Sequence, residues 1–391
     1  MNNHLLGSRN WWIDGEEAFF FTVGMGTLFR VDLKTCQCVF LAIIPKSSMI
    51  YCALESHCRK YKDKIYYIPH KLGKIYCYDL KKSTWEEVVA GYEGTLMVCE
   101  GFSSKEEDTI WFLEQEGKRV IQFNLENEKI EQEYTVPQHT NMDSIQYILV
   151  HNELYYINGS GICCIDIEHH TSVKYNIEGI DFQLHTICYD GQNFWISGVH
   201  EIICIWNPVH GVLRTINNIL SEYTLLDYAK KMVVPKAPLF NFSIFLGEYV
   251  WFIPIQANAP IIYIQKNECT VHILEIDEEE ETEETLNDRG HAMKYVVQYV
   301  RNKRYIGVLS IKNRNIFEID TENMQVIEKK YIFDHRTQYM VADAYFSEKK
   351  ILCEDAGRDQ NIFEILLRRG MKDKKMKFSN QGKNIYDFIT Y

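Results

Sequence analysis

Short runs of apolar and aromatic residues alternate along this chain with polar turns. In the stretch KIYCYDLKKSTWEEV, Lys74 to Val88, one run ends on Asp79 and the next begins at Trp85. Flat and β-branched side chains in short runs bounded by turn residues are typical of strands. The stretch therefore predicts two strands joined by a turn, in which the Asp79 carboxylate accepts hydrogen bonds from backbone amides and Trp85 packs between neighbouring sheets.

The same pattern returns along nearly the whole chain. Each copy has two apolar runs, a polar or turn-forming marker at the end of the second run, and a further run; another short apolar run precedes each copy, which gives four antiparallel strands per unit. A period of about 40 to 50 residues with several strands per unit predicts an all-β fold, the β-propeller built from four-stranded blades. The markers stand at Asp32, Asp79, Asn124, Asp166, Asn207, Gln265, Asp320 and Leu366.

The number of copies favours eight blades, with seven as the alternative. The weakest copy, Lys349 to Gly370, could combine with the N-terminal strand around Asn10 to Asp14 into one closing blade, because ring closure removes exposed sheet edges. We expect a single propeller domain over residues 1–370. The tail, residues 371–391, is expected to be a closing strand or a docking segment.

The stretch YCYDLKKSTWEEV, Tyr76 to Val88, resembles the closing half of a kelch repeat, in which an aromatic strand ends in Asp and a Trp follows six positions later. The Gly-Gly pair of kelch repeats is absent, since YYIPH, Tyr66 to His70, stands in its place. The chain thus resembles a divergent member of the broad kelch-like and WD40-like propeller group over nearly its whole length. The resemblance implies an architecture and leaves the function open.

The first of two long spacings between markers contains Ile219 to Leu239. Ile219, Tyr223, Leu226 and Ala229 have helical spacing, with Ser221 as a possible cap and Pro235 as a stop. The pattern predicts a short helix on the rim of the propeller, which is either a plain rim helix or one that shapes a pocket or docks a partner. The candidate partner-binding residues of this segment are Tyr223, Leu226 and Tyr228.

The second long spacing contains the acidic stretch Asp277 to His291. Like charges at this density repel one another and stay hydrated, so we expect a solvated loop; a basic partner surface is the alternative. The spacing of a calcium loop is absent.

The end of the chain, Asn380 to Tyr391, carries apolar residues at helical spacing. It either seals the propeller as a strand or helix, or docks into a groove of another protein, because such anchors are what grooves recognise. The candidate partner-binding residues here are Ile385, Tyr386, Phe388 and Ile389.

Composition narrows the class of partner. The formal net charge is -12, and a negative field repels phosphate backbones, so we expect no nucleic-acid partner. The basic stretch Leu366 to Phe378 is expected to be a solvated segment. No run of 18 apolar residues and no secretory signal is visible, and the 12 Cys are scattered through strand-like runs, which predicts a cytoplasmic protein without a membrane anchor.

No motif assigns a catalytic residue, a cofactor or a metal. Cys163 and Cys164 lack zinc-site spacing, and as neighbours on one strand they should face opposite sides; Glu168 to His170 reads as a surface turn. Nucleophile-elbow and phosphate-loop motifs are also absent. A composite site made from several blades stays open, with His70, His200 and His291 as residues to check.

The sequence therefore favours a non-catalytic binding or scaffolding propeller that holds another protein or a peptide through its rim loops and central depression. The alternative is an enzyme, a lyase or a glycan-acting hydrolase, with a composite site at the mouth of the channel. The oligomeric state is left open.

Overall fold

A computed structural model provides the three-dimensional structure of the chain. The residues that it describes are 11–21, 27–44, 57–68, 74–89, 96–100, 108–114, 118–137, 145–199, 202–223, 225–227, 232–233, 239–254, 257–274, 276, 294–310, 315–333 and 337.

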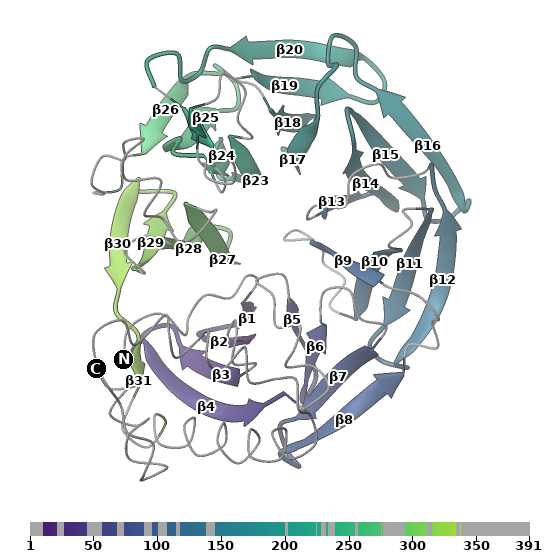
Figure 1. Ribbon diagram of the computed structural model, residues 1–391, viewed down its shortest axis with the longest axis vertical. Coiled ribbons are helices and arrows are strands. Elements are labelled where there is room, and N and C mark those ends of the chain that lie inside the picture. The colour runs from purple at the N-terminus through teal and green to yellow at the C-terminus, as the bar shows by residue number, and fades with distance from the viewer. Residues whose placement is uncertain are drawn as a thin grey trace. The chain divides into compact units, whose positions relative to one another are not determined.

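The fold is an all-β propeller of seven blades, each built from four antiparallel strands (Figure 1). Blades are numbered here in chain order. By contact the chain divides into two compact units, residues 1–69, 76–86 and 330–391 in the smaller one and residues 70–75 and 87–329 in the larger one. The predicted single domain over residues 1–370 stays a prediction.

The smaller unit contains blade 1 and most of blade 2; residues 74–75 and 87–89 of blade 2 belong to the larger unit. Blade 1 carries a fifth strand from much later in the chain, β31 (Ile332–Phe333), on the outer side of β4. The strands of blade 1 are β1 (Trp12–Asp14), β2 (Glu17–Phe21), β3 (Thr27–Asp32) and β4 (Gln37–Ile43), and those of blade 2 are β5 (His57–Tyr61), β6 (Lys64–Ile68), β7 (Lys74–Asp79) and β8 (Thr84–Val89).

The larger unit contains five blades, and in each the first strand is the innermost (Figure 1). The inner strands β9 and β13 also pair with each other in parallel, which joins blades 3 and 4 into one eight-stranded sheet. The strands of blades 3 and 4 are β9 (Leu96–Glu100), β10 (Thr109–Glu114), β11 (Arg119–Asn124), β12 (Lys129–Thr135), β13 (Ile145–Val150), β14 (Glu153–Asn158), β15 (Gly161–Asp166) and β16 (Thr171–Asn176). Those of blades 5 to 7 are β17 (Leu184–Tyr189), β18 (Phe194–Gly198), β19 (Ile202–Asn207), β20 (Gly211–Asn217), β23 (Phe240–Leu246), β24 (Tyr249–Pro254), β25 (Ile261–Gln265), β26 (Val271–Leu274), β27 (Tyr295–Arg301), β28 (Tyr305–Ser310), β29 (Ile316–Asp320) and β30 (Gln325–Lys329).

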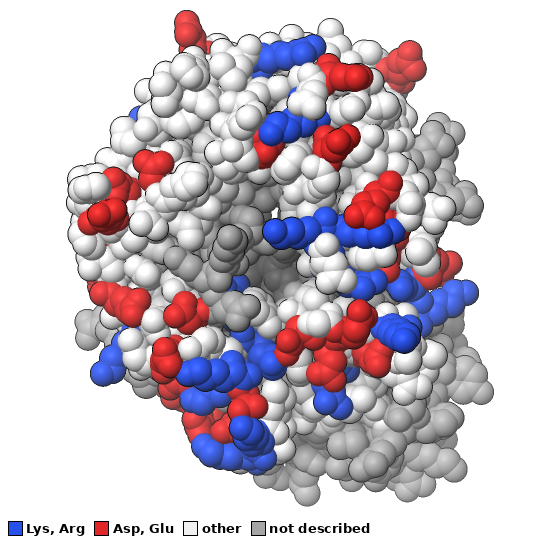
Figure 2. Space-filling view, turned by 180° about the vertical axis from the view of Figure 1, so that it is seen from behind, with Lys and Arg blue, Asp and Glu red and all other residues white. Residues whose placement is uncertain are grey.

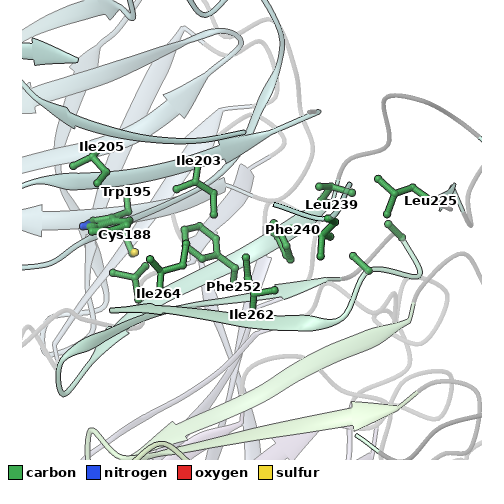
Figure 3. Packing of buried hydrophobic residues seen from close by; sticks show 14 residues of the cluster. Cys188, Trp195, Ile203, Ile205, Leu225, Leu239, Phe240, Phe252, Ile262 and Ile264 are labelled. Atoms are coloured by element: carbon green, nitrogen blue, oxygen red, sulfur yellow. The ribbon is translucent and has the colours of Figure 1, made fainter. Parts of the chain in front are cut away.

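Packing between blades explains the apolar runs. The second strand of a blade is covered on both faces, so β18 is buried at every position. The outer strand β12 instead alternates between exposed residues and residues that are partly or fully buried. Figure 3 shows the cluster between blades 5 and 6, where Trp195 and Ile203 of blade 5 lie close to Phe252 and Ile262 of blade 6. Burial of such clusters is the main source of stability for the fold.

The turns between third and fourth strands confirm the marker positions. The first seven markers each end a third strand, and Asp79 accepts hydrogen bonds from the backbone amides of Lys81 and Lys82 at 2.9 Å, as predicted. Trp85 packs on the apolar cluster between blades 1 and 2, also as predicted. The sequence did not indicate that the residue four positions after each marker has a positive φ. These residues are Cys36, Ser83, Glu128, His170, Gly211, Cys269 and Met324.

The preference for eight blades is not supported, because the structure has seven. The N-terminal residues Trp12 to Asp14 pair with β2 and so supply the inner strand of blade 1. The weak eighth copy, residues 349–370, lies outside the described residues.

The predicted rim helix within Ile219 to Leu239 is not found in the described residues either. Leu226 lies in the short strand β21 (Leu226–Asp227), which pairs with β22 (Met232–Val233). The backbone amide of Leu226 donates to the side chain of Asn258 at 2.8 Å, and the amide of Asn258 donates back to the Leu226 carbonyl. This long-range pairing holds the segment in an extended conformation, which overrides its helical spacing.

Candidate functional site

The predicted partner-binding residues fall in different places. Tyr223 is 37% exposed in a loop, while Leu226 is only 3% exposed and belongs to the core. The other five, Tyr228, Ile385, Tyr386, Phe388 and Ile389, lie outside the described residues. The binding role of all seven stays a prediction.

The cysteines are part of the core. Cys163 packs between blades 3 and 4 and Cys164 between blades 4 and 5, which confirms that the two neighbours face opposite sides. Burial raises the pKa of Cys164 to about 12 and that of Cys204 to about 11. Such thiols stay protonated near neutral pH, so neither has the thiolate character of a nucleophile.

The histidines in the turn after β15 are at the surface, as predicted. His169 Nδ1 lies 2.8 Å from a carboxylate oxygen of Asp166, and this hydrogen bond raises the pKa of His169. No group of three or more His, Cys, Asp or Glu residues in the described ranges could hold a metal ion. His70, His200 and His291 lie outside those ranges. Nor does the described part of the chain form a helix of the length and apolarity needed to cross a membrane.

Three polar side chains on the inner strands β13, β17 and β23 bond to one another across three successive blades. Gln146 Nε2 donates to the Ser243 carbonyl at 2.8 Å, Thr186 Oγ1 donates to Gln146 Oε1 at 2.7 Å, and the Thr186 and Ser243 hydroxyls lie 2.7 Å apart. Because Thr186 gives its proton to Gln146, the Ser243 hydroxyl must donate to Thr186. The three buried groups satisfy one another, which ties the inner strands together.

Polar residues also occupy the irregular positions of three inner strands. The register shifts at His185 in β17, at Asn241 in β23 and at Gln298 in β27. Such bulges re-aim side chains and are frequent next to functional sites. The Asn241 Oδ1 atom is buried and accepts no hydrogen bond from any described residue. We call these three residues, with Gln146, Thr186 and Ser243, the inner polar layer.

The inner polar layer consists mainly of neutral donors and acceptors. Those of Gln146, Thr186 and Ser243 are buried and already bond to one another. Within this network Ser243 gives its proton to the hydroxyl of Thr186, a neutral group. The sequence carried a signal for this layer, a polar residue inside the first apolar run of successive units. This signal alone does not predict the contact, because the contact spans three blades.

Exposed aliphatic side chains recur on the outer strands. A sheet edge presents unpaired backbone groups and invites strand addition. Among the described residues, no further strand pairs with the outer side of β16, β20, β26 or β30. We call these strands, with the side chains that they expose, the outer edges of the larger unit. The exposed residues are Val173, Leu213, Ile273 and Ile327.

Charges of both signs cover the described surface. Figure 2 shows acidic and basic side chains interspersed rather than gathered by sign on the face that it displays. Many are paired, as Arg119 is with Glu114 and Glu133. On the face that Figure 2 displays, the described residues therefore form no continuous track of basic side chains.

Comparison with known proteins supports the fold alone. No protein-family model matches the chain, and no curated protein matches it. Many solved structures are similar. The computationally designed protein Ika8 is 10% identical with a TM-score of 0.50, over 81% of this chain and 85% of that one.

Two further structures are similar at lower scores. BamB from Moraxella catarrhalis is 11% identical with a TM-score of 0.45, over 80% of this chain and 83% of that one. Kuenenia stuttgartiensis hydrazine synthase is 10% identical with a TM-score of 0.46, over 66% of this chain and 74% of that one.

Proposed function

We propose that this protein is a non-catalytic binding or scaffolding propeller that holds another protein or a peptide. The observation that carries the proposal is the recurrence of exposed aliphatic side chains on the outer edges of the larger unit. Open strand edges bind extended segments through backbone hydrogen bonds, and the side chains that they present add apolar contact. The rim loops and the central depression are further surfaces in this proposal.

The finer assignments belong to the same proposal. We infer a divergent kelch-like or WD40-like propeller in the cytoplasm, which binds neither nucleic acid nor membrane. The burial of Cys163, Cys164 and Cys204 as free thiols suits a reducing compartment.

The test is to identify proteins that co-purify with the tagged chain from its native host and then to measure the affinity of each purified pair. The triple variant Val173→Asp, Leu213→Asp, Ile273→Asp places a charge on three outer edges. We expect it to weaken binding at least tenfold, or about 1.4 kcal/mol, because the partner loses apolar contact and meets charge.

A control places new charges on two of the same strands without the loss of aliphatic side chains. Thr171→Asp and Thr215→Asp alter exposed positions of β16 and β20 and should leave the affinity within about twofold. Equal affinities for wild type and the triple variant would contradict the role of the outer edges. Retained binding by Tyr223→Ala and by a chain lacking residues 380–391 would show that the loop and the tail are not needed.

A further inference from the structure

One outer edge in the structure already holds an added strand. After β30 the chain continues through Lys330 and Tyr331 into β31, which lies parallel to β4. The Ile332 amide donates to the Cys36 carbonyl at 2.8 Å, and the Thr337 hydroxyl lies 3.4 Å from the Cys38 carbonyl. The pairing is between backbone groups, and it covers only two residues of ladder.

The added strand also presents two aromatic side chains to blade 1. Tyr331 and Phe333 are two residues apart and both are buried, while Ile332 between them is 50% exposed. The Tyr331 ring meets the edge of Trp11 at 5.3 Å, and the Phe333 ring meets Phe29 at 5.3 Å. Alternate side chains of a strand point to the same side, so an aromatic pair at positions i and i+2 fits this surface.

The receiving surface is a row of stacked rings. Phe20 lies between Trp11, at 4.2 Å, and Phe29, at 5.5 Å, and its ring is nearly parallel to both. We call these three rings the aromatic platform. Tyr331 packs on Trp11 at one end of this platform and Phe333 packs on Phe29 at the other end. The backbone of β4 pairs with the added strand beside the platform. This is the combination by which strand addition gains both affinity and specificity.

We propose that the outer side of β4 and the aromatic platform form a recognition site for an extended peptide that reads aromatic, any residue, aromatic, and that residues 331–333 occupy this site as an internal competitor. The inference rests on the proposed function and names the chemistry of the partner. A two-residue ladder opens at low cost compared with the core strands, because few backbone bonds must break. An external peptide binds once the internal segment leaves, so its apparent affinity falls by the fraction of open sites.

The test uses a fluorescent peptide with the sequence KYIFD, which is that of residues 330–334, and the full-length chain. In Tyr331→Ala, Phe333→Ala the competitor loses both anchors, and we expect the peptide to bind at least tenfold more tightly than to wild type by fluorescence anisotropy. The matched control, Ile332→Ala, changes an exposed side chain between the two anchors and should bind like wild type. A peptide with alanine in place of both aromatic residues should bind the double variant at least tenfold more weakly. The proposal would be overturned if the double variant bound both peptides with equal affinity, or if wild type and the double variant bound KYIFD with equal affinity.

A second measurement uses the wild-type chain, in case the double variant unfolds. Saturating KYIFD should displace β31 and speed hydrogen exchange at the Ile332 amide, while the alanine peptide leaves it unchanged. An unchanged rate with both peptides would overturn the proposal. If a partner binds Phe29→Ala at full affinity but not the outer-edge triple variant, this inference fails and the proposed function stands.

Discussion

Blades 6 and 7 have the same four-stranded topology but carry different side chains at matching positions of their strands. In blade 6 three aromatic side chains stand opposite one another across β24, β25 and β26: Trp251 stacks on Tyr263 at 4.8 Å, and Tyr263 stacks on His272 at 5.0 Å. In blade 7 the matching positions hold Gly307, Glu318 and Ile327. At these positions blade 6 has a stack of aromatic rings, and blade 7 has a buried carboxylate.

The missing ring of blade 7 comes from the neighbouring strand. Tyr299 of β27 stands opposite Gly307, and a Cβ atom at position 307 would lie 2.3 Å from its ring. The Tyr299 hydroxyl donates to Glu318 at 2.9 Å, so the ring lies across the glycine and ends at the carboxylate. In blade 7 a ring from the neighbouring strand thus occupies the space beside the glycine, where blade 6 has the ring of Trp251.

The buried carboxylate is held by opposite charges. Glu318 is 2% exposed; Arg301 donates to its two oxygens at 2.8 and 3.0 Å, and Lys329 Nζ lies 3.1 Å away. A buried charge is tolerated only when it is paired and hydrogen-bonded, and among the described residues Glu318 is bound by Tyr299, Arg301 and Lys329, all of blade 7. Blade 6 therefore depends on ring packing at this position, while blade 7 depends on a hydrogen-bonded charge cluster.

Removal of the carboxylate should have the largest effect. Glu318→Ala leaves Arg301, Lys329 and the Tyr299 hydroxyl without their common partner, and we expect a loss of about 3–5 kcal/mol in the free energy of unfolding. Urea denaturation measures the loss, and hydrogen exchange of the β27–β30 amides should place it in blade 7. The triple variant Glu318→Leu, Arg301→Met, Lys329→Met removes all three charges and should recover most of the stability. A triple variant as unstable as Glu318→Ala would show that packing, and not unpaired charge, causes the loss.

A side chain at position 307 should have the next effect. Gly307→Ala drives a methyl group into the Tyr299 ring, and we expect a loss of about 1–3 kcal/mol, because overfilled cores force shifts of side chains and backbone. In the double variant Gly307→Ala, Tyr299→Ala the clash is absent. Its loss of stability should therefore be smaller than the sum of the losses of the two single variants Gly307→Ala and Tyr299→Ala. If urea denaturation showed that the losses of the two single variants are additive, Gly307 and Tyr299 would not be coupled and the clash would not be the cause of the loss.

The hydroxyl of Tyr299 should contribute less, because Glu318 keeps Arg301 and Lys329 without it. We expect Tyr299→Phe to lower the free energy of unfolding by about 1.5 kcal/mol, the lower end for a hydrogen bond to a charged group. The matched control in blade 6, Tyr263→Phe, keeps the ring that stacks on Trp251 and should change stability by less than about 0.5 kcal/mol. Equal losses in the two blades would remove the contrast between them.

The sequence predicted the parts of the fold that depend on local order. The apolar runs, the markers at Asp32 to Asp320 and the hydrogen bonds of Asp79 follow from residues close together in the chain. The predicted helix is not found in the described residues, because Leu226 pairs with Asn258, which lies 32 residues further along the chain. The spacing of a few apolar residues carries no information about a contact between residues so far apart in the chain.

The candidate sites were hidden for the same reason. The inner polar layer joins Gln146 to Ser243, 97 residues apart, and the aromatic platform receives a strand from the other end of the described chain. Within blade 7, Gly307 in an otherwise apolar run was the visible sign of an unusual packing arrangement. Its meaning required the register that places Tyr299 and Glu318 on either side of it.

The smallest effect should appear as a difference in acid sensitivity. Burial alone would raise the pKa of Glu318, but the hydrogen bonds and charges of Arg301 and Lys329 outweigh it and hold the pKa below its usual value. A group whose folded-state pKa is lowered contributes stability that is fully present above its pKa in the unfolded chain, about 4.3, and is lost as the pH falls through the folded-state value. The stability advantage of wild type over Glu318→Gln should therefore shrink as the pH falls below about 5.

Urea midpoints of both proteins at a series of pH values from neutral to acid measure this advantage. Tyr263→Phe removes no group that titrates between neutral and acid pH and should follow wild type through the same range, since the ring stack of blade 6 contains no carboxylate. An advantage of wild type that stays constant down to the acid limb would mean that Glu318 has the same pKa in the folded and unfolded chain. The polar network of blade 7 would then stabilise the fold through its shape and hydrogen bonds and not through its charge, which would bring it closer to the ring stack of blade 6.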